Sequence, residues 1–457
     1  MAEPYAGVAL LADPVHHYLQ FTVPLSAGEV CEQTVLDSPW VQRLRYIYQL
    51  QSARWVFPGA EHSRFQHSLG AMHIAGRLAR HLYPTLREHH AGVPSECLIE
   101  ELLRMTGLLH DLGHGPFGHF FDENHLARFG LSHERVGGRI ITEALGEMLS
   151  AIRRSPHGPF APGEAIDPQH ISYLINKGPE GEVDDPTVPP WVAALRPLFS
   201  GIFTADNMDY VLRDSYMCGV AIGPVDIDRL IHYTFFSKRG VTLHRAGLSA
   251  LNMFLTARLY LYSNVYFHRT TRAIDLHLRE IFPQTMAEVW DADPARDLAS
   301  YLRVTEWALL EEVRRWGADA GGVRGALGRE WQRILGRDVK WKMAYDTVVS
   351  TRDVADQTPR IDPGRLEEGI RERLPPALRA LEFRVDLASK DTRPLNPLNM
   401  GHKQIYVFDP SSNEVSTAAL RDHFDYIPAK ILHCRIFALD HHHDAALGEA
   451  AEAVLYG

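Results

Sequence analysis

A histidine and an aspartate stand together at positions 110 and 111, at the end of an apolar stretch of the chain. An imidazole nitrogen beside a carboxylate oxygen can begin a metal site, although a chain with 25 histidines will contain such a pair by chance. Two further residues strengthen the pattern, because His67 stands upstream in RFQHSLG and Asp206 stands far downstream in ADNMDY. Two imidazoles and two carboxylates suit one divalent transition metal such as manganese, iron, zinc or nickel. The sequence therefore predicts a metal site made by His67, His110, Asp111 and Asp206.

The third of these segments adds an acidic and aromatic stripe. Asp206, Tyr210 and Asp214 are spaced at four-residue intervals, which places them on one face of a helix. At about 1.5 Å of rise per residue, the two aspartates lie roughly 12 Å apart. That separation is similar to the distance from an α-phosphate to the far side of a deoxyribose, so the stripe favours a bound nucleotide. The alternative is an ordinary helix with a solvated acidic face.

Histidines recur after the His-Asp pair, at positions 114, 119 and 133, with Asp122 among them. Histidine is the side chain best suited to proton transfer near neutral pH. Cleavage of a phosphoester needs an in-line nucleophile and a proton for the leaving oxygen, and a metal can supply the nucleophile by lowering the pKa of bound water. We therefore expect proton chemistry in this segment, the alternative being ordinary helix-end or loop histidines.

Four longer motifs carry a family resemblance. They are Asp13-Pro14-Val15-His16, the run DSPWVQRLR at 37–45, VFPGA at 56–60, and the segment 110–119. Together they resemble the HD-domain phosphohydrolases, and within them the branch of bacterial and animal deoxynucleoside triphosphate triphosphohydrolases. The resemblance covers approximately residues 1–280. It implies a predominantly α-helical fold and hydrolysis of deoxynucleoside triphosphates to deoxynucleoside and inorganic triphosphate.

The resemblance also implies roles for individual residues. His133 would act near the α-phosphate, with His114 and Asp122 coupled to it, and Arg64 would contact a phosphate. Tyr210 would pack where a 2′-hydroxyl would lie, and Asp214 with Gln49 would meet the 3′-hydroxyl. The full set of substrate contacts is Gln49, Leu50, His119, Tyr210, Asp214, Arg258, Tyr262 and Arg269. The alternatives are a structural salt bridge for Arg64 and a core-facing aromatic stripe for the segment 258–269.

A regulatory site is implied as well. In the resembled branch, an Asp, a Gln and an Arg of one signature bind a guanine nucleotide at an inter-subunit activator site, and Asp37, Gln42 and Arg45 stand at those positions. The resemblance further implies a homo-oligomer, either a dimer or a tetramer, and Mg²⁺ accompanying the substrate phosphates. The alternative for this segment is an ordinary helix start with Asp37 as the N-cap.

These residues must be positioned by a mainly helical chain. We expect an HD-domain helical core over residues 1–300 and a small C-terminal α+β lobe over 301–457. Short strands are expected at 8–11 and 17–21, and in the lobe at 403–408 and 431–437. Helices are expected at 39–50, 67–81, 98–109, 133–151 and 170–175, and then with few breaks from 191 to 316.

The composition limits the class of protein and its partners. The apolar fraction of 45% and the charged fraction of 23% are ordinary for a globular protein. The net charge of −10 argues against binding of long nucleic acid, which needs clustered positive charge. No run approaches about 20 apolar residues and no signal peptide is evident, so no membrane span is expected. The four cysteines are scattered without a CxxC spacing, which favours reduced thiols and a cytoplasmic location.

Two other functions stay open at this stage. An HD site could act on another nucleotide, such as a monophosphate, a cyclic nucleotide, a guanosine alarmone or a short single strand, because fold alone does not choose the substrate. The chain could also be a nucleotide-sensing oligomeric module with little catalysis. Product identity separates the first of these functions from triphosphate release, and nucleotide binding without turnover would indicate the second.

Overall fold

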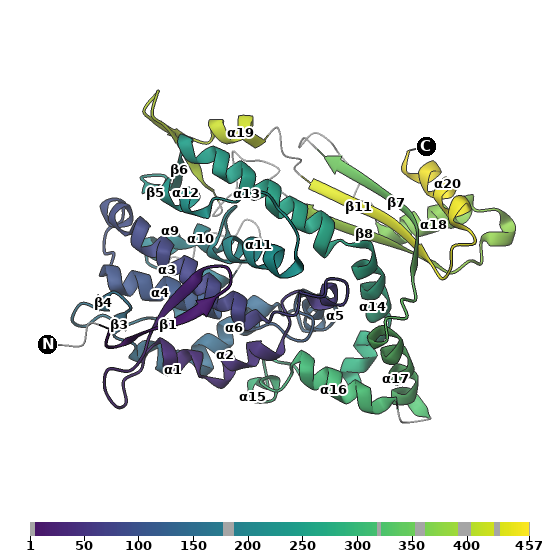
Figure 1. Ribbon diagram of the computed structural model, residues 1–457, viewed down its shortest axis with the longest axis horizontal. Helices are drawn as coiled ribbons and strands as arrows, with labels where there is room; N and C mark the ends of the chain where they lie inside the picture. The colour runs from purple at the N-terminus through teal and green to yellow at the C-terminus, as the bar shows by residue number, and fades with distance from the viewer. Residues whose placement is uncertain are drawn as a thin grey trace.

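The computed structural model describes residues 5–176, 187–317, 321–351, 362–391, 404–424 and 430–456. It is 56% helical, with small sheets toward the C-terminus, which confirms the expected fold class. Figure 1 shows the helices of the first two thirds of the chain packed together, and a sheet with two covering helices at the C-terminal end. Within the described residues, no helix is both long and apolar enough to cross a membrane. A cytoplasmic location stays a prediction.

Long helices form the core of the molecule. They are α3 (Arg64–His89), α4 (Glu96–Leu109), α11 (Ala205–Cys218), α13 (Leu248–Leu261) and α14 (Arg269–Val289). Helices α3 and α4 approach closely at Gly107, where a Cβ atom would lie 2.7 Å from the carbonyl oxygen of Ala71. Because α3 packs on both α4 and α11, the ends of three motif-bearing segments come together.

Shorter helices complete this part of the chain. Helix α2 begins at a proline after Ser38, whose hydroxyl accepts a hydrogen bond from the amide of Val41. The expected helix 133–151 is divided, because a π-helical turn at Ile140–Ala144 separates α6 from α7. The bounds are α1 (Glu32–Leu36), α2 (Pro39–Arg43), α5 (His119–Asn124), α6 (His133–Arg139), α7 (Gly146–Ala151), α8 (Pro168–Ile175), α9 (Pro190–Leu195), α10 (Pro197–Ser200), α12 (Ile227–His232), α15 (Leu298–Tyr301), α16 (Glu306–Trp316) and α17 (Gly322–Leu335).

Within the described part of the chain, the strands form four small sheets. The hairpin β1 (Val8–Asp13) and β2 (His17–Thr22) and the two-residue pair β3 (Arg154–Ser155) and β4 (Gly158–Pro159) are antiparallel. A four-stranded sheet has the order β10-β9-β6-β5, and a three-stranded sheet has the order β7-β11-β8. The bounds are β5 (Thr234–Ser237), β6 (Gly240–His244), β7 (Lys342–Thr351), β8 (Phe383–Asp391), β9 (Tyr406–Asp409), β10 (Glu414–Ser416) and β11 (Lys430–Ala438).

The expected strands are present with small shifts. The hairpin strands and β11 include the segments expected near the two ends of the chain. The strand expected at 403–408 begins at Tyr406, and residue 403 lies outside the described residues.

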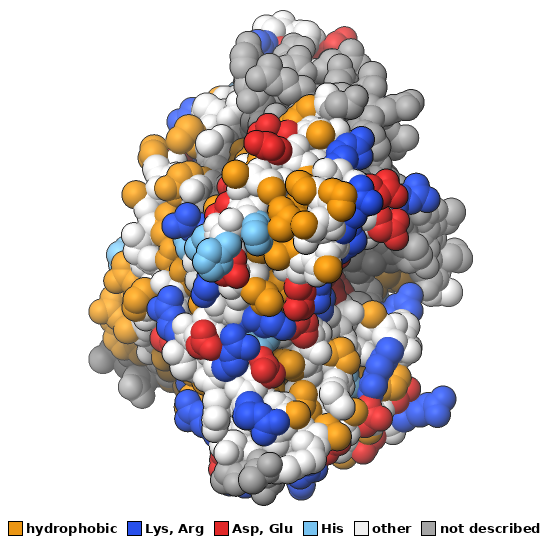
Figure 2. Space-filling view, turned by 90° about the vertical axis from the view of Figure 1, so that its right-hand side faces the viewer, with side chains coloured by type: hydrophobic (Ala, Val, Ile, Leu, Met, Phe, Trp, Pro, Cys, Tyr) orange, Lys and Arg blue, Asp and Glu red, His pale blue; other side chains and the backbone are white. Residues whose placement is uncertain are grey.

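Within the described residues, the C-terminal segment contributes to three apolar clusters, the smallest of which contains Trp341 and Phe437. Helices α18 (Pro363–Arg373) and α20 (Asp444–Leu455) pack against the three-stranded sheet around a separate apolar cluster. Helices α16 and α17, the short helix α19 (Ala418–Phe424) and strand β9 instead add side chains to the main cluster. The division at residue 300 stays a prediction. Figure 2 shows the C-terminal end of the molecule, where positive and negative side chains are interspersed over the described surface.

Three buried contacts hold the loop between α4 and α5. The guanidinium of Arg43 donates hydrogen bonds to the carbonyl oxygens of Leu112, His114 and Val304, at 3.3, 2.7 and 2.6 Å. The Tyr301 hydroxyl donates to the carbonyl of Gly113 at 2.7 Å. A carboxylate oxygen of Glu306 accepts from the amide of Phe117 at 3.2 Å, where φ is +63°.

Glu306 should make the stability of the protein depend on pH. Burial raises the pKa of Glu306 to about 7, although Arg54 and backbone amides oppose the increase. Since this pKa lies above the usual 4.5, the folded state binds the proton more tightly, and its stability falls as pH rises from about 4.5 to about 7. Glu306→Gln keeps the acceptor for Phe117 and cannot ionise. We expect its free energy of unfolding to exceed that of the wild type at pH 8, by up to about 3 kcal/mol.

Urea denaturation at pH 5 and pH 8 measures this difference. The control is Glu311→Gln on the same helix, whose side chain is 70% exposed and which should unfold like the wild type at both pH values. If the Glu306→Gln protein were no more stable than the wild type at pH 8, Glu306 would not be the group responsible.

Candidate active site

The four predicted metal ligands meet at the centre of the helical core. Nε2 of His67 lies 3.2 Å from Nε2 of His110 and 3.2 Å from an Asp206 carboxylate oxygen. The Asp111 carboxylate lies 3.3 Å from Nε2 of His110 and 3.9 Å from Nε2 of His67. We call these four residues the metal centre, because the donor atoms of His67, His110 and Asp206 lie within 4.8 Å of one another and Asp111 lies beside them.

Hydrogen bonds on the outer side of each imidazole fix its orientation. Nδ1 of His110 donates to the carbonyl oxygen of Gly107 at 2.8 Å. Nδ1 of His67 lies 2.8 Å from a carboxylate oxygen of Asp209, which can only accept when ionised. Both Nε2 atoms therefore keep their lone pairs for a metal ion, as is usual for metal-binding histidines.

Asp209 is itself held by a buried network that sequence reasoning missed. It accepts two hydrogen bonds from Arg213, both at 2.9 Å, and lies 2.7 Å from Nε2 of His16. Arg213 also pairs with Asp13 at 2.8 Å. The motif Asp13-Pro14-Val15-His16 was identified only as part of a resemblance. Its Asp13 and His16 hold the Asp209–Arg213 pair, which in turn orients His67. The signal in the sequence was the spacing of three between Asp206 and Asp209, which places both on one side of a helix.

The charges of the metal centre favour a cation. Burial opposes protonation of His67, but Asp206 and Asp209 raise its pKa to about 10. Asp206 and Asp111 are buried, yet their neighbours lower both pKa values below the usual range. Since a ligating imidazole must be neutral, binding of a divalent ion would replace the proton on His67. The donor set fits one transition metal and leaves the metal's identity open.

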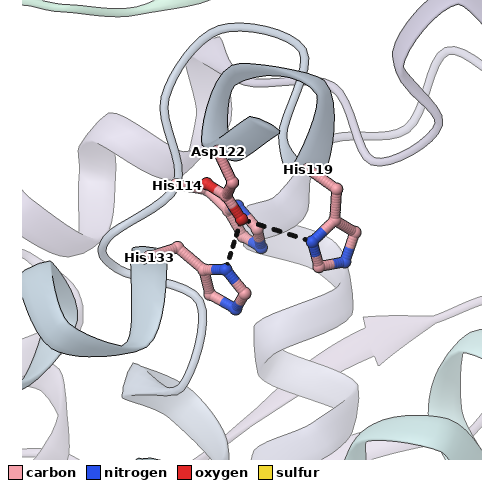
Figure 3. A group of neighbouring side chains, drawn as sticks. All are labelled: His114, His119, Asp122 and His133. Atoms are coloured by element: carbon pink, nitrogen blue, oxygen red, sulfur yellow. Dashed lines mark hydrogen bonds and ion pairs between the residues drawn. The ribbon is translucent and has the colours of Figure 1, made fainter. Parts of the chain in front are cut away.

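Figure 3 shows a second group of side chains, which lies beside the metal centre because Nε2 of its His114 is 3.4 Å from an Asp111 oxygen. In this histidine cluster, one Asp122 oxygen lies 2.5 Å from Nδ1 of His133 and 3.4 Å from Nδ1 of His119. The His114 ring stacks on the His133 ring with centroids 3.7 Å apart. The cluster comes from the loop after α4, from α5 and from the start of α6, so helices α5 and α6 bring it together.

The members of the histidine cluster differ in their affinity for a proton. Burial opposes protonation of His133, but Asp122 raises its pKa above the ordinary value. Burial, Arg64 and His133 lower the pKa of His114 to about 4. Desolvation in the cavity wall and the nearby charges of His133 and Arg64 lower the pKa of His119, although its side chain is 63% exposed. His133 is therefore the member that most readily carries a proton, and Asp122 stabilises that charge.

Arg64 connects the two groups. Its Nη1 atom donates to Asp111 at 2.6 Å, so the guanidinium neutralises a ligand of the metal centre. Its Nε atom is buried without a hydrogen-bond partner. Gly118, at φ +53°, leaves room for this side chain, because a Cβ atom there would lie 2.2 Å from Nη2 of Arg64. Arg64 therefore makes a structural salt bridge, which was the alternative to a phosphate contact. Its side chain also lines the cavity described next.

Both groups open into a cavity of about 610 Å³. Among the predicted residues, His114 and Asp122 are not in its wall, and Arg269 is exposed at the start of α14 away from it. The predicted residues that line the cavity are Gln49, Leu50, Arg64, His67, His110, Asp111, His119, His133, Asp206, Tyr210, Asp214, Arg258 and Tyr262. We call it the active-site cavity.

One wall of this cavity contains a carboxylate, that of Asp214, whose orientation is fixed by two hydrogen bonds. Asp214 accepts hydrogen bonds from Nε2 of His62 at 2.8 Å and from the Tyr266 hydroxyl at 2.6 Å. Tyr210 packs edge-on against Tyr266, with ring centroids 6.4 Å apart. The side-chain oxygen of Gln49 is buried and accepts no hydrogen bond from the described residues. Sequence reasoning found Asp214, Tyr210 and Gln49 but missed His62 and Tyr266.

The predicted activator residues lie on another surface. Arg45 donates to the Gln42 side chain at 2.7 Å, and its guanidinium lies 3.7 Å from the centre of the Phe65 ring. Asp37 is exposed at the end of α1. The alternative with Asp37 as a helix N-cap is wrong, because Ser38 caps α2. Binding of a guanine nucleotide here stays a prediction.

Comparisons with known proteins agree with this site. A family model described as HD domain matches residues 64–172, and one described as HD associated region matches residues 225–338. An uncharacterized protein of Methanocaldococcus jannaschii is 32% identical over 62% of this chain and 54% of its own length. Deoxynucleoside triphosphate triphosphohydrolase SAMHD1 of Gallus gallus is 28% identical over 83% of this chain and 63% of its own length.

A solved structure is also similar. It is the crystal structure of a hypothetical protein from Aquifex aeolicus, with a TM-score of 0.69 and 28% identity over 98% of this chain and 100% of that one. The chain spans 54% to 63% of the length of the curated relatives given above.

Asp209 gives the first test of the metal centre. Asp209→Asn removes the charge that orients His67, and we expect the affinity for Mn²⁺ to fall about 10- to 100-fold. Competition with a fluorescent chelator measures this affinity, and circular dichroism checks the fold. Asp291→Asn, at a side chain that is 57% exposed, is the control and should bind Mn²⁺ like the wild type. Equal affinity for the Asp209 variant and the control would show that the metal centre does not depend on this carboxylate.

Proposed function

Because the chain is an HD-domain protein with an HD-associated region, we propose that it hydrolyses deoxynucleoside triphosphates to deoxynucleoside and inorganic triphosphate. The coarser assignment, a metal-dependent phosphohydrolase of the HD type, rests on the metal centre and the family match. The finer assignment rests on the wall of the active-site cavity.

The choice of a deoxynucleotide as substrate rests on the order of three side chains along α11. Asp206 of the metal centre, Tyr210 and Asp214 follow one another along α11, and all three line the active-site cavity. A nucleotide laid along this helix would place a phosphate at the metal centre and its sugar against Tyr210 and Asp214. Gln49 also lines the cavity, where its side-chain amide would meet a sugar hydroxyl. The tyrosine ring would occupy the space that a 2′-hydroxyl needs, which favours a deoxyribose.

The side chains suggest how the reaction proceeds. A divalent ion held by the metal centre would activate water and neutralise phosphate charge. Water adds to the α-phosphorus, the bond from that phosphorus to the 5′-oxygen breaks, and the leaving oxygen takes a proton. His133 is the proton donor, since it lines the cavity and Asp122 favours its protonated form. Arg64 lines the cavity, and its guanidinium would bind a phosphate oxygen.

Product analysis tests this function. Each deoxynucleoside triphosphate and each ribonucleoside triphosphate is supplied separately with Mn²⁺, with and without GTP or dGTP, and the products are separated by chromatography. We expect tripolyphosphate and deoxynucleoside in equal amounts. Dependence on added GTP or dGTP would support the activator site at Asp37, Gln42 and Arg45, and size-exclusion chromatography would show whether the expected dimer or tetramer forms.

The control for this assay is His110→Gln, which should abolish turnover by removing a metal ligand. Release of single phosphate or pyrophosphate, or turnover of cyclic nucleotides, alarmones or short strands alone, would contradict the proposal and favour another nucleotide as substrate. Binding of nucleotides without any turnover would favour a sensing module.

Tyr210 gives a test of sugar selection. Tyr210→Ala opens the space beside the ribose C2′ atom, so we expect the preference for deoxynucleotides over ribonucleotides, measured as a ratio of kcat/KM values, to fall by about tenfold, or about 1.4 kcal/mol. The control is Tyr260→Ala, an exposed tyrosine outside the cavity, which should keep the wild-type ratio. An unchanged ratio in the Tyr210 variant would remove this residue from sugar selection.

A further inference from the structure

A second cavity, of about 230 Å³, lies between the β1–β2 hairpin, helices α3 and α4, and the turn between β3 and β4. It shares no lining residue with the active-site cavity. We call it the arginine cavity, because three arginines line it. Its wall consists of Leu10, Tyr18, Gln20, His73, Gly76, Arg77, Arg80, Glu100, Arg104 and His157.

The charged groups that face this cavity are mainly cationic. Arg77, Arg80 and Arg104 are opposed in the wall by a single carboxylate, that of Glu100. Glu100 is 1% exposed, and it accepts hydrogen bonds from the Ser155 hydroxyl at 2.7 Å and from His157 at 2.8 Å, so its oxygens are already engaged.

The two arginines at more exposed positions, Arg77 and Arg80, make no strong buried ion pair with an acidic side chain of the described residues. Arg77 pairs with Asp228, whose side chain is 78% exposed, and such a surface pair contributes little stability. The nearest Glu100 oxygen lies 3.6 Å from Nε of Arg80, and Arg80 donates one hydrogen bond to His157 at 2.8 Å. Both guanidinium groups therefore have N–H donors available for a ligand.

The floor of the cavity is a buried guanidinium with one open edge. Arg104 is 4% exposed, and its Nε and Nη2 atoms donate to Glu32 and to the carbonyl oxygen of Gln20. Its Nη1 atom has no hydrogen-bond partner among the described residues. A Cβ atom at Gly76 would lie 2.9 Å from this Nη1, so the glycine leaves the edge uncovered.

Gly76 is unusual in the interior of a long helix, where glycine costs about 1 kcal/mol relative to alanine. Its φ is not in the left-handed region, so backbone conformation does not require it. The close approach of Arg104 favours glycine here, because a Cβ atom would lie 2.9 to 3.1 Å from three atoms of its side chain.

The pKa of His73, in the cavity wall, reflects a positive electrostatic potential inside the cavity. Burial, together with the nearby His16, Arg77 and Arg104, lowers the pKa of His73 to about 3, and Asp13 opposes this only in part. The ring is therefore neutral near pH 7, and the surrounding cations remain available to an anion.

We propose that the arginine cavity binds a phosphate-sized oxyanion between Arg77, Arg80 and the open edge of Arg104. Guanidinium groups are suited to this role, because each presents N–H donors in a fork that matches the oxygens of a phosphate. The volume lies below the roughly 300–1,000 Å³ of pockets for larger ligands, so a small inorganic anion fits better than a whole nucleotide.

Titration calorimetry with inorganic phosphate on the metal-loaded protein tests the proposal. The test variant is R77Q/R80Q, which removes both outer charges at partly exposed positions. The matched control is R87Q, an exposed arginine on the same helix outside the cavity. We expect the wild type and R87Q to bind phosphate alike, and the affinity of one site to fall at least about tenfold in R77Q/R80Q. Identical titrations for all three proteins would overturn the proposal.

Crystals soaked in tungstate give a second measurement that does not depend on the variants. An anomalous peak within hydrogen-bond distance of Arg77 and Arg80 is the expected result, and a peak at the metal centre alone would contradict it. Neither measurement needs turnover, so failure of the proposed triphosphohydrolase activity would leave this test unaffected, and failure of the oxyanion site would leave the proposed activity unaffected.

Discussion

The hydrogen bond between His67 and Asp209 is the contact on which the metal centre depends. It fixes Nδ1 of His67 as a donor and directs Nε2 toward His110 and Asp206. A buried carboxylate is stable only when it is paired, and Asp209 is paired with Arg213 and His16. Gly70 is required for the same reason, since a Cβ atom there would lie 1.8 Å from an Asp209 oxygen. The hydrogen bonds that orient His67 therefore also fix the hairpin, α3 and α11 relative to one another.

The histidine cluster has its own support, from segments far away in the sequence. Arg43, from the segment before α3, and Tyr301, from the segment after α14, bind the carbonyl groups that follow the His-Asp pair. Glu306, within the matched HD-associated region, binds the amide of Phe117 just before the cluster helix α5. The loop carries a residue in the left-handed region, which costs energy unless its surroundings hold it. This dependence gives the HD-associated region a physical role, because it stabilises the loop that carries His114 and leads to His119.

The parts of the site that could be predicted from sequence are those encoded by local spacing. The metal ligands and the stripe Asp206, Tyr210 and Asp214 follow from motif order and helical periodicity. Asp209 was missed because an acidic residue beside other polar residues on a helix is usually solvated, and only long-range packing buries it. Arg269 was expected in the cavity together with Arg258 and Tyr262, but the helix ends after the π-helical turn at Tyr262–Tyr266. A new helix, α14, begins at Arg269 after the non-helical residue His268, so helical spacing does not continue across this break.

The same π-turn connects the C-terminal sheet to the substrate wall. Tyr266 ends the turn and donates to Asp214, while the next residue, Phe267, accepts a hydrogen bond through its carbonyl from Arg435 of β11 at 2.5 Å. A carboxylate can accept about four hydrogen bonds, so Asp214 has acceptor capacity beyond its bonds to His62 and Tyr266. Under the proposed function, a sugar hydroxyl would meet an acceptor whose orientation those two partners already fix, and would lose little free energy to reorganisation. Strand β11 would then contribute to substrate selection together with the helices that hold the metal centre.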